Sequence, residues 1–224
     1  MTTIRVVAAH EVVRGIYPRP VTEKDELAIA VGRAIDSALS KFGHEYSHNL
    51  RPTAASILAF ATEVLDEGIR DADIEVPVPD RDRILGEIAN TIRAYRKSEI
   101  FALPRPRSRL VLINGQAGVY AQPDYWDRQS RFYEMKSFRT SPPPPDVDLQ
   151  LRLFQLAFPG LTGILISFDR HSVPVTVRRY ECPPLTDGSR RETLLLALRI
   201  ALEVGQEKVL EQVDAQTVGY TVEP

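Results

Sequence analysis

The sequence predicts an α/β fold in which a mixed sheet is flanked by helices and preceded by a helical lobe. Apolar residues recur every three or four positions through most of the first 97 residues, which is the spacing of helices with one buried face. After Lys97 the apolar spacing shifts toward two, which is typical of strands. An Asn114-Gly115 pair then marks a tight hairpin turn between two β-prone runs.

Three helices are expected in the lobe, and the first has a recognisable beginning. In residues 21–42, Thr22 can act as an N-cap, and the acidic residues that follow favour the positive end of a helix. The second helix covers residues 52–66. A segment with two prolines then interrupts the pattern, because proline breaks helices, and the third helix covers residues 80–95.

The rest of the chain predicts a core of strands and helices. A strand at residues 109–113 and its return at 119–122 flank the hairpin turn, and an alternating strand follows at 132–138, so that the three form a meander. The remaining expected elements are a helix at 146–158, strands at 163–168 and 173–180, and a long helix at 189–213.

The chain divides into three parts that also differ in charge. We assign residues 1–97 to a helical lobe that contributes to the fold, 98–214 to the core, and 215–224 to a loosely ordered tail. The formal net charge of the whole chain is only −2. However, residues 1–92 carry a net charge of −5 and residues 93–152 a net charge of +5. Such an excess also occurs on ordinary surfaces, but it leaves nucleic acid open as a partner.

Composition excludes several classes of protein. The only cysteine, Cys182, rules out an intrachain disulfide framework, a cysteine-based zinc finger and an all-cysteine iron–sulfur cluster. No apolar run has the roughly 18–20 residues that a membrane helix needs, and the N-terminus lacks the apolar core of a secretion signal. We therefore expect a cytoplasmic protein that does not associate with membranes.

Two acidic residues and a lysine form the pattern that carries chemistry. Glu134 and Lys136 are two positions apart on an expected strand, so both side chains point to one face, whereas Met135 points to the core. Asp124 ends the preceding strand, and Asp127 is its rival further into the turn. Paired carboxylates at an open site suit Mg²⁺ or Mn²⁺. The alternative is a solvated sheet face with a weak cross-strand ion pair.

This pattern resembles the PD-(D/E)XK nuclease superfamily. Pro123-Asp124 stands for the PD element, and Glu134-Met135-Lys136 stands for the EXK element. The expected order of elements is also similar to the restriction-endonuclease-like core of that superfamily, over roughly residues 98–182. The resemblance implies a metal-dependent nuclease.

Further positions resemble the RecB-like branch of the superfamily. Gln150 would be the glutamine of its QxxxY motif, although Phe154 replaces the tyrosine. Asp36 would replace the histidine of its GxxxH motif, which begins at Gly32. The alternative for Gln150 is that it occupies an ordinary polar position on a helix. The alternative for Asp36 is that it is a plain surface residue. The residues that compete with Asp36 as metal ligands are Glu45, Glu63 and Glu87. The cluster-bearing relatives use four cysteines, so this chain is expected to hold no iron–sulfur cluster.

The resemblance implies a role for each of these residues. Mg²⁺ or Mn²⁺ would be held by Asp124, Glu134, the backbone carbonyl of Met135 and, with less support, Asp36. Lys136 would position the attacking water, and Gln150 would orient Lys136 or a phosphate. The basic and aromatic residues around the motif would contact DNA, single- or double-stranded, through phosphates or unpaired bases: Arg128, Arg131, Arg139, Arg152, Tyr125 and Trp126. For the two aromatic residues, packing in the core is the alternative.

Two functions from different classes therefore remain open. The first is a nuclease that hydrolyses DNA phosphodiester bonds in repair, recombination or defence against mobile DNA; an RNA nuclease would use the same residues and differ only in its substrate. The second is a catalytically silent subunit with the same fold, acting as a nucleic-acid-binding or assembly module. In that case the acidic lobe would dock a partner protein, and the long helix at 189–213 could form a homo-oligomer.

Overall fold

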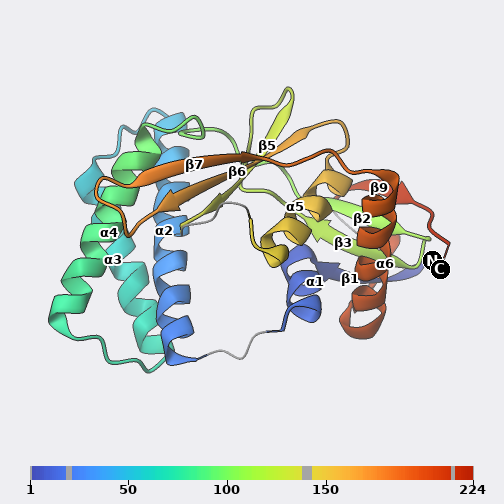
Figure 1. Ribbon diagram of the computed structural model, residues 1–224, viewed down its shortest axis with the longest axis horizontal. Coiled ribbons are helices and arrows are strands. Elements are labelled where there is room, and N and C mark those ends of the chain that lie inside the picture. Colours follow the sequence, from blue (N-terminus) through green and yellow to red (C-terminus); the bar gives the residue numbers. More distant parts are fainter. Residues whose placement is uncertain (1, 19–21, 138–142, 213–214, 224) are drawn as a thin grey trace.

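A computed structural model describes residues 2–18, 22–137, 143–212 and 215–223 of the chain. Within them there are six α-helices and nine strands; four helices in succession follow the first strand, and four strands in succession follow those helices (Figure 1). The helices are α1 (Ala9–Ile16), α2 (Glu23–Ser47), α3 (Ala54–Asp71), α4 (Val78–Arg96), α5 (Pro145–Ala157) and α6 (Asp187–Val204). The strands are β1 (Thr3–Ala8), β2 (Arg109–Ile113), β3 (Ala117–Ala121), β4 (Tyr125–Trp126), β5 (Arg131–Lys136), β6 (Thr162–Asp169), β7 (Thr176–Glu181), β8 (Gln206–Val209) and β9 (Gln216–Tyr220).

The strands form two mixed sheets. The five-stranded sheet has the order β8-β1-β3-β2-β9, and the four-stranded sheet has the order β4-β5-β6-β7. Each sheet contains both parallel and antiparallel pairs; β5, for example, is antiparallel to β4 and parallel to β6. The predicted α/β class with a mixed sheet flanked by helices is therefore confirmed, with the strands divided between two sheets instead of one.

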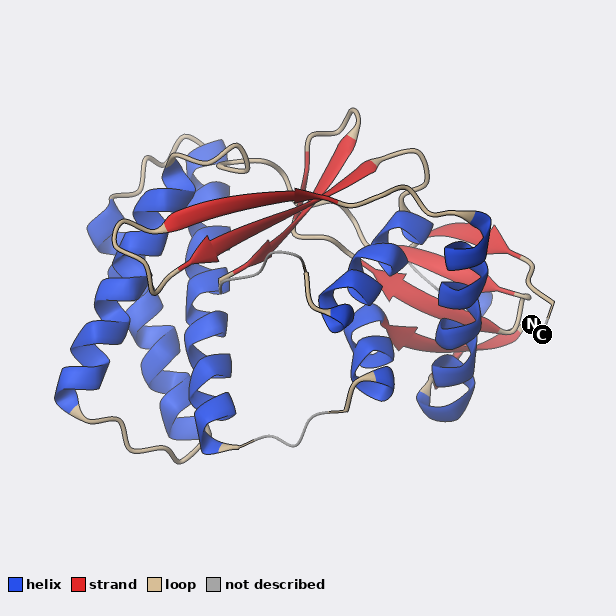
Figure 2. Cartoon of the chain, viewed as in Figure 1, coloured by secondary structure: helices blue, strands red, loops and turns tan. Residues whose placement is uncertain are grey.

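Helices α2, α3 and α4 pack together and cover one face of the four-stranded sheet. They lie side by side at one end of the molecule, beneath that sheet as Figure 2 shows it. Their apolar faces share one core with alternate residues of β5 and β6, among them Tyr133, Met135 and Ile166. Thr22 caps α2 as predicted, because its side chain accepts a hydrogen bond from the backbone N–H of Asp25.

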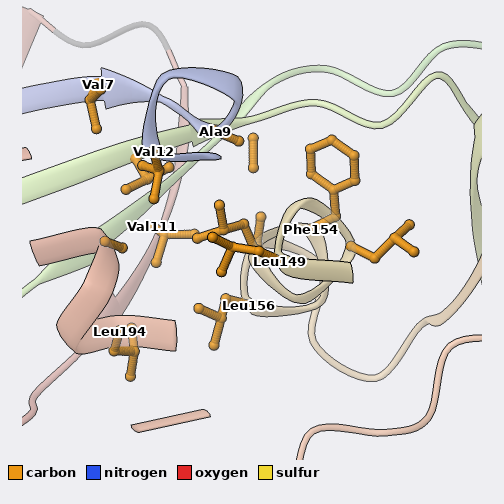
Figure 3. Close-up of a cluster of buried hydrophobic side chains, with 14 of the residues drawn as sticks. Val7, Ala9, Val12, Val111, Leu149, Phe154, Leu156 and Leu194 are labelled. Carbon is orange, nitrogen blue, oxygen red and sulfur yellow. The ribbon is translucent and has the colours of Figure 1, made fainter. Parts of the chain in front are cut away.

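Helix α5 connects the two sheets through a second core. Its buried residues Leu149, Phe154 and Leu156 meet α1, α6 and the five-stranded sheet (Figure 3). Phe132 of β5 and Leu165 of β6 belong to the same core. Because side chains alternate along a strand, β5 and β6 thus contribute to both cores at once.

The two ends of the chain differ from the sequence prediction. β1 lies within the region predicted as a helical lobe, and it pairs with β3 in the five-stranded sheet. The tail predicted as loosely ordered contains β9, which pairs with β2, and Asn114 fixes it further by two hydrogen bonds to the Val222 backbone. The last helix ends at Val204 instead of residue 213, and β8 follows it. β8 and β9, the edge strands of the five-stranded sheet, pair with strands that lie about a hundred or more positions away in the sequence.

The predicted three-stranded meander is also divided. β2 and β3 form the expected hairpin, with left-handed backbone at Asn114 and Gly115. β5, however, pairs with the short β4 and with β6 in the other sheet. Pro123 has no backbone N–H to continue the ladder of β3, and the chain leaves that sheet after Ala121.

No helix in the described ranges combines the length and the apolar character needed to cross a membrane.

Two helical glycines give a direct test of the packing between α2 and α3. A Cβ atom on Gly68 would lie 3.0 Å from the Cβ of Ala30, whereas a Cβ on Gly32 would meet no atom within 4 Å. Alanine is favoured over glycine inside a helix by about 0.5–1 kcal/mol. We expect Gly32→Ala to raise the free energy of unfolding by about that amount, and Gly68→Ala to raise it less or to lower it. Urea denaturation followed by circular dichroism measures both, and equal stabilisation would contradict the packing.

Candidate active site

The register of a short strand pair brings two carboxylates together. Tyr125 of β4 pairs with Tyr133 of β5, and Trp126 pairs with Phe132. Continuing this antiparallel register by one residue places Asp124 opposite Glu134. Directly opposed like charges destabilise a sheet unless another group offsets them. The local fold therefore puts two acids where they need a cation or a hydrogen-bond donor.

Lys136 supplies one such cation. Its Nζ lies 2.6 Å from Oε1 of Glu134, two residues away on the same face of β5. The Glu134 side chain is only 5% exposed and that of Lys136 22%. Burial lowers the pKa of Lys136, but the charges of Glu134 and Asp124 outweigh it, so that this pKa lies above its usual value. Lys136 is therefore a cation at neutral pH.

Asp124 is held at the open edge of β5. Its Oδ2 accepts a hydrogen bond of 2.8 Å from the backbone N–H of Met135. If β4 were longer, one of its backbone carbonyl groups would accept this hydrogen bond instead. Its Oδ1 accepts a hydrogen bond of 3.3 Å from the Arg105 guanidinium. Burial and the Glu134 charge nevertheless raise the pKa of Asp124 to about 7. The Asp124 carboxylate thus gains more from a nearby cation than an exposed aspartate would.

Asp36 of α2 faces the same place from the helical side. The Arg105 guanidinium lies 3.9 Å from the Asp36 carboxylate, and it therefore bridges Asp36 and Asp124. Burial raises the pKa of Asp36, and the Asp124 charge raises it further, while Arg105 and Lys136 lower it. These electrostatic effects show that Asp36 and the strand residues belong to one charged cluster.

These groups line a cavity of about 530 Å³ between α2 and the edge of β5. The sequence motifs meet here: Gly32 and Asp36 come from one side, and Asp124, Glu134 and Lys136 from the other. Arg170, which follows β6, adds a further cation near Glu87, at 3.5 Å. Among the described residues, the lining consists of Ala28, Gly32, Asp36, Asp124, Glu134, Met135, Lys136, Ser137 and Arg170.

The donor set of the cavity suits a hydrated metal ion better than a closed protein cage. Among the residues that the structure describes, no three His, Cys, Asp or Glu side chains are close enough together to hold a metal ion. Asp36 therefore shares the cavity without completing a three-acid cluster. Mg²⁺ is commonly bound by only one or two carboxylates and retains several waters, so Asp124 and Glu134 fit its requirements.

Asp127, the rival of Asp124, has a structural role. Its Oδ1 accepts hydrogen bonds from the backbone N–H groups of Gln129, Ser130 and Arg131 and so shapes the turn between β4 and β5. Slight burial raises the pKa of Asp127, but these backbone donors outweigh it and lower the value to about 2. The structure thus favours Asp124 over Asp127 as the residue of the cavity.

The other predicted residues lie apart from the cavity. Gln150 is half-buried on α5 and is not among the lining residues. Arg152 pairs with Asp148 at 2.7 Å and with Glu192 at 3.2 Å, so two carboxylates already neutralise its charge. Arg131 is exposed on the outer end of β5. Arg139 lies outside the described residues.

The two predicted stacking residues have different environments. Tyr125 is 4% exposed and packs in the core beside Tyr95, with ring centroids 6.0 Å apart. The prediction that Tyr125 stacks on bases is therefore corrected, because its ring has no accessible face. Trp126 is half-buried, and its ring meets Phe158 edge-on. Part of its surface remains available to a ligand.

The sequence did not place Arg105 between Asp36 and Asp124, and it did not single out Arg170. Arg105 was only one of several arginines before β2, and its position between Asp36 and Asp124 depends on residues 69 and 19 positions away. The Pro-Arg alternation of residues 104–107 was the one available signal, because prolines restrict the backbone on both sides of Arg105. Nothing in the sequence around Arg170 distinguished it.

Comparisons with known proteins give only distant similarities. No protein-family model matches the chain, and no curated protein matches it. Among solved structures, SSO0001 is similar with a TM-score of 0.39 and 15% identity, over 88% of this chain and 84% of the other. An exonuclease from Eubacterium rectale, described as putative, is similar with a TM-score of 0.44 and 10% identity, over 73% of each chain. Similarities at this level do not establish a shared function.

Stability should depend on pH in opposite ways at Asp124 and Asp127. The pKa of Asp124 rises from 3.8 unfolded to about 7 folded, so its ionisation destabilises the fold as pH increases through that window. The pKa of Asp127 falls to about 2, so its ionised form stabilises the fold above pH 3.8. In metal-free buffer at about pH 8, we expect Asp124→Asn to raise the Tm and Asp127→Asn to lower it. At about pH 5 the gain of Asp124→Asn should largely disappear, and a gain independent of pH would contradict the buried acid pair.

Proposed function

We propose that the protein is a metal-dependent nuclease of the PD-(D/E)XK type that hydrolyses phosphodiester bonds in DNA. The observation that carries this proposal is the convergence of Asp124, Glu134 and Lys136 on one cavity, which Asp36 also lines. An accidental ion pair on a solvated sheet face would not leave Glu134 with only 5% of its side chain exposed. Two acids and a lysine that share a cavity match the chemistry of phosphodiester hydrolysis, in which negative charge develops on the phosphate.

Asp124, Glu134 and the backbone carbonyl of Met135 would hold Mg²⁺ or Mn²⁺. The N–H and C=O of a strand residue point to the same edge, and the Met135 N–H donates to Asp124. The Met135 carbonyl therefore faces the side on which Asp124 lies, beyond the end of β4. When bound, such an ion supplies a Lewis acid for the phosphate and lowers the pKa of a coordinated water.

Lys136 would act as a donor and as a positive charge. Because its pKa is raised, it carries its proton at neutral pH and cannot serve as a general base. Its ammonium group can orient the attacking water or stabilise charge on the phosphate. Gln150 has no contact with the cavity in this arrangement, and we give it no catalytic role.

One observation favours the second candidate, a catalytically silent binding or assembly subunit. Both carboxylates are already paired with cations of the chain itself, Glu134 with Lys136 and Asp124 with Arg105. If Arg105 stays in place, it satisfies Asp124 without a metal ion. Metal binding therefore discriminates between the two candidates.

Nuclease activity tests the proposal at Lys136. The purified protein should degrade end-labelled DNA in the presence of Mg²⁺ or Mn²⁺ and not in the presence of EDTA. Lys136→Ala should reduce the rate constant by about 100-fold or more, the usual effect of removing one transition-state donor. Lys97→Ala is the matched control, because Lys97 is exposed at the end of α4 and outside the cavity. Equal activity in the Lys136→Ala and Lys97→Ala proteins would refute the role of Lys136.

Calorimetry tests the metal ligands without depending on catalysis. Mn²⁺ should bind to the wild-type protein, and binding should weaken at least tenfold in Asp124→Asn, because the amide removes one charged ligand. Asp127→Asn should bind Mn²⁺ as the wild type does, since Asp127 serves the turn. Wild-type protein that binds no Mn²⁺ would favour the silent subunit.

A further inference from the structure

A basic groove adjoins the catalytic cavity, and its lining is one-sided in charge. It encloses about 890 Å³, and its described lining includes four arginines and no aspartate or glutamate. These are Arg105, Arg107, Arg109 and Arg128, with Trp126 and Phe158 between them. For a chain with a net charge of −2, such a cluster is a local exception that suits a polyanion.

The arginines of the groove keep most of their charge available. Within the described part of the chain, no ion pair involves Arg107, Arg109 or Arg128. Arg109 has only uncharged partners: its guanidinium lies 4.4 Å from the centre of the Phe158 ring and donates to the Ala157 carbonyl. These contacts orient the guanidinium without neutralising it.

The walls of the groove are fixed before any ligand arrives. The backbone N–H of Trp126 donates to the Pro104 carbonyl at 3.0 Å, and the Gln122 side chain donates to the Pro106 carbonyl at 2.8 Å. Two prolines alternate with Arg105 and Arg107, so this segment loses little conformational entropy on binding. On the opposite side, the Asp127 turn holds Arg128 in its left-handed conformation.

Arg105 joins the groove to the catalytic cavity. It lines the groove, and its guanidinium also contacts Asp124 and Asp36, which line the cavity. A phosphate that approaches along the groove would compete with Asp124 for Arg105. Once Arg105 turns to the phosphate, the Asp124 carboxylate is free to take a cation.

We propose that this groove binds an unpaired strand of DNA and leads it to the Asp124–Glu134 cavity. The inference rests on the proposed nuclease function for the identity of the strand. Trp126 favours a single strand over a duplex, because it lines the groove and an unpaired base can stack on an aromatic ring, whereas the bases of a duplex are already stacked on one another. The arginines would bind the phosphates on either side of that base.

Fluorescence tests the groove separately from catalysis, since Trp126 is the only tryptophan of the chain. In EDTA, an oligothymidylate of about 15 nucleotides should quench Trp126 emission, and a duplex hairpin with as many phosphates should not. Arg107→Glu and Arg128→Glu should each weaken binding about tenfold and reduce its dependence on salt. Arg70→Glu, an exposed reversal of the same charge on α3, should bind as the wild type does. Circular dichroism and Tm confirm that each variant is folded.

The results of these experiments distinguish the proposal for the groove from the proposal that the protein is a nuclease. If wild-type protein cleaves DNA but shows no quenching, or if Arg70→Glu weakens binding as much as Arg107→Glu, the groove assignment is overturned and the nuclease proposal stands. If quenching occurs as expected but no metal supports cleavage, the groove is supported and the nuclease proposal fails. Quenching by oligouridylate and not by oligothymidylate would overturn the assignment of the strand as DNA.

Discussion

The repulsion between Asp124 and Glu134 organises the surrounding structure. The β4–β5 register places the two acids opposite each other, and burial raises the pKa of Asp124 to about 7. Three groups of the chain offset this cost: the Lys136 ammonium, the Arg105 guanidinium and the backbone N–H of Met135. A polypeptide that gained nothing from paired acids would replace one of them, since hydrophobic or neutral residues pack at lower cost. The metal ion that we propose would add a further cation beside the two acids.

The larger architecture holds these few groups in place. β5 contributes to both hydrophobic cores, with Phe132 on the side of α5 and with Tyr133 and Met135 on the side of α2. A strand fixed on both faces cannot slip by one residue without burying Glu134 and Lys136 in the wrong environment. The three-helix lobe has a related role, because α2 places Asp36 and Gly32 on the wall of the cavity.

Local signals allowed much of the fold to be predicted. The Thr22 cap, the Asn114-Gly115 turn and the spacing of residues in α2 act over a few positions, and each gave an element close to the observed one. β1 and β9 were missed because their partners, β3 and β2, lie about a hundred positions away along the chain. For the candidate site, the spacing of Glu134 and Lys136 indicated a shared face, whereas the burial of Tyr125 and the bridging position of Arg105 depend on tertiary packing. Trp126 and Tyr125 are adjacent and similar in chemistry, and only the packing distinguishes the accessible ring from the buried one.

The proposed function depends on a divalent-metal site that Asp124 and Glu134 would form at the edge of β5. Diffraction data collected at the manganese absorption edge, from crystals grown with Mn²⁺, would locate an ion at this site. We expect one anomalous peak between the Asp124 and Glu134 carboxylates, on the side of the Met135 carbonyl, with Arg105 moved away from Asp124. An Arg105–Asp124 ion pair that persists at saturating Mn²⁺, with no anomalous peak in the cavity, would contradict it.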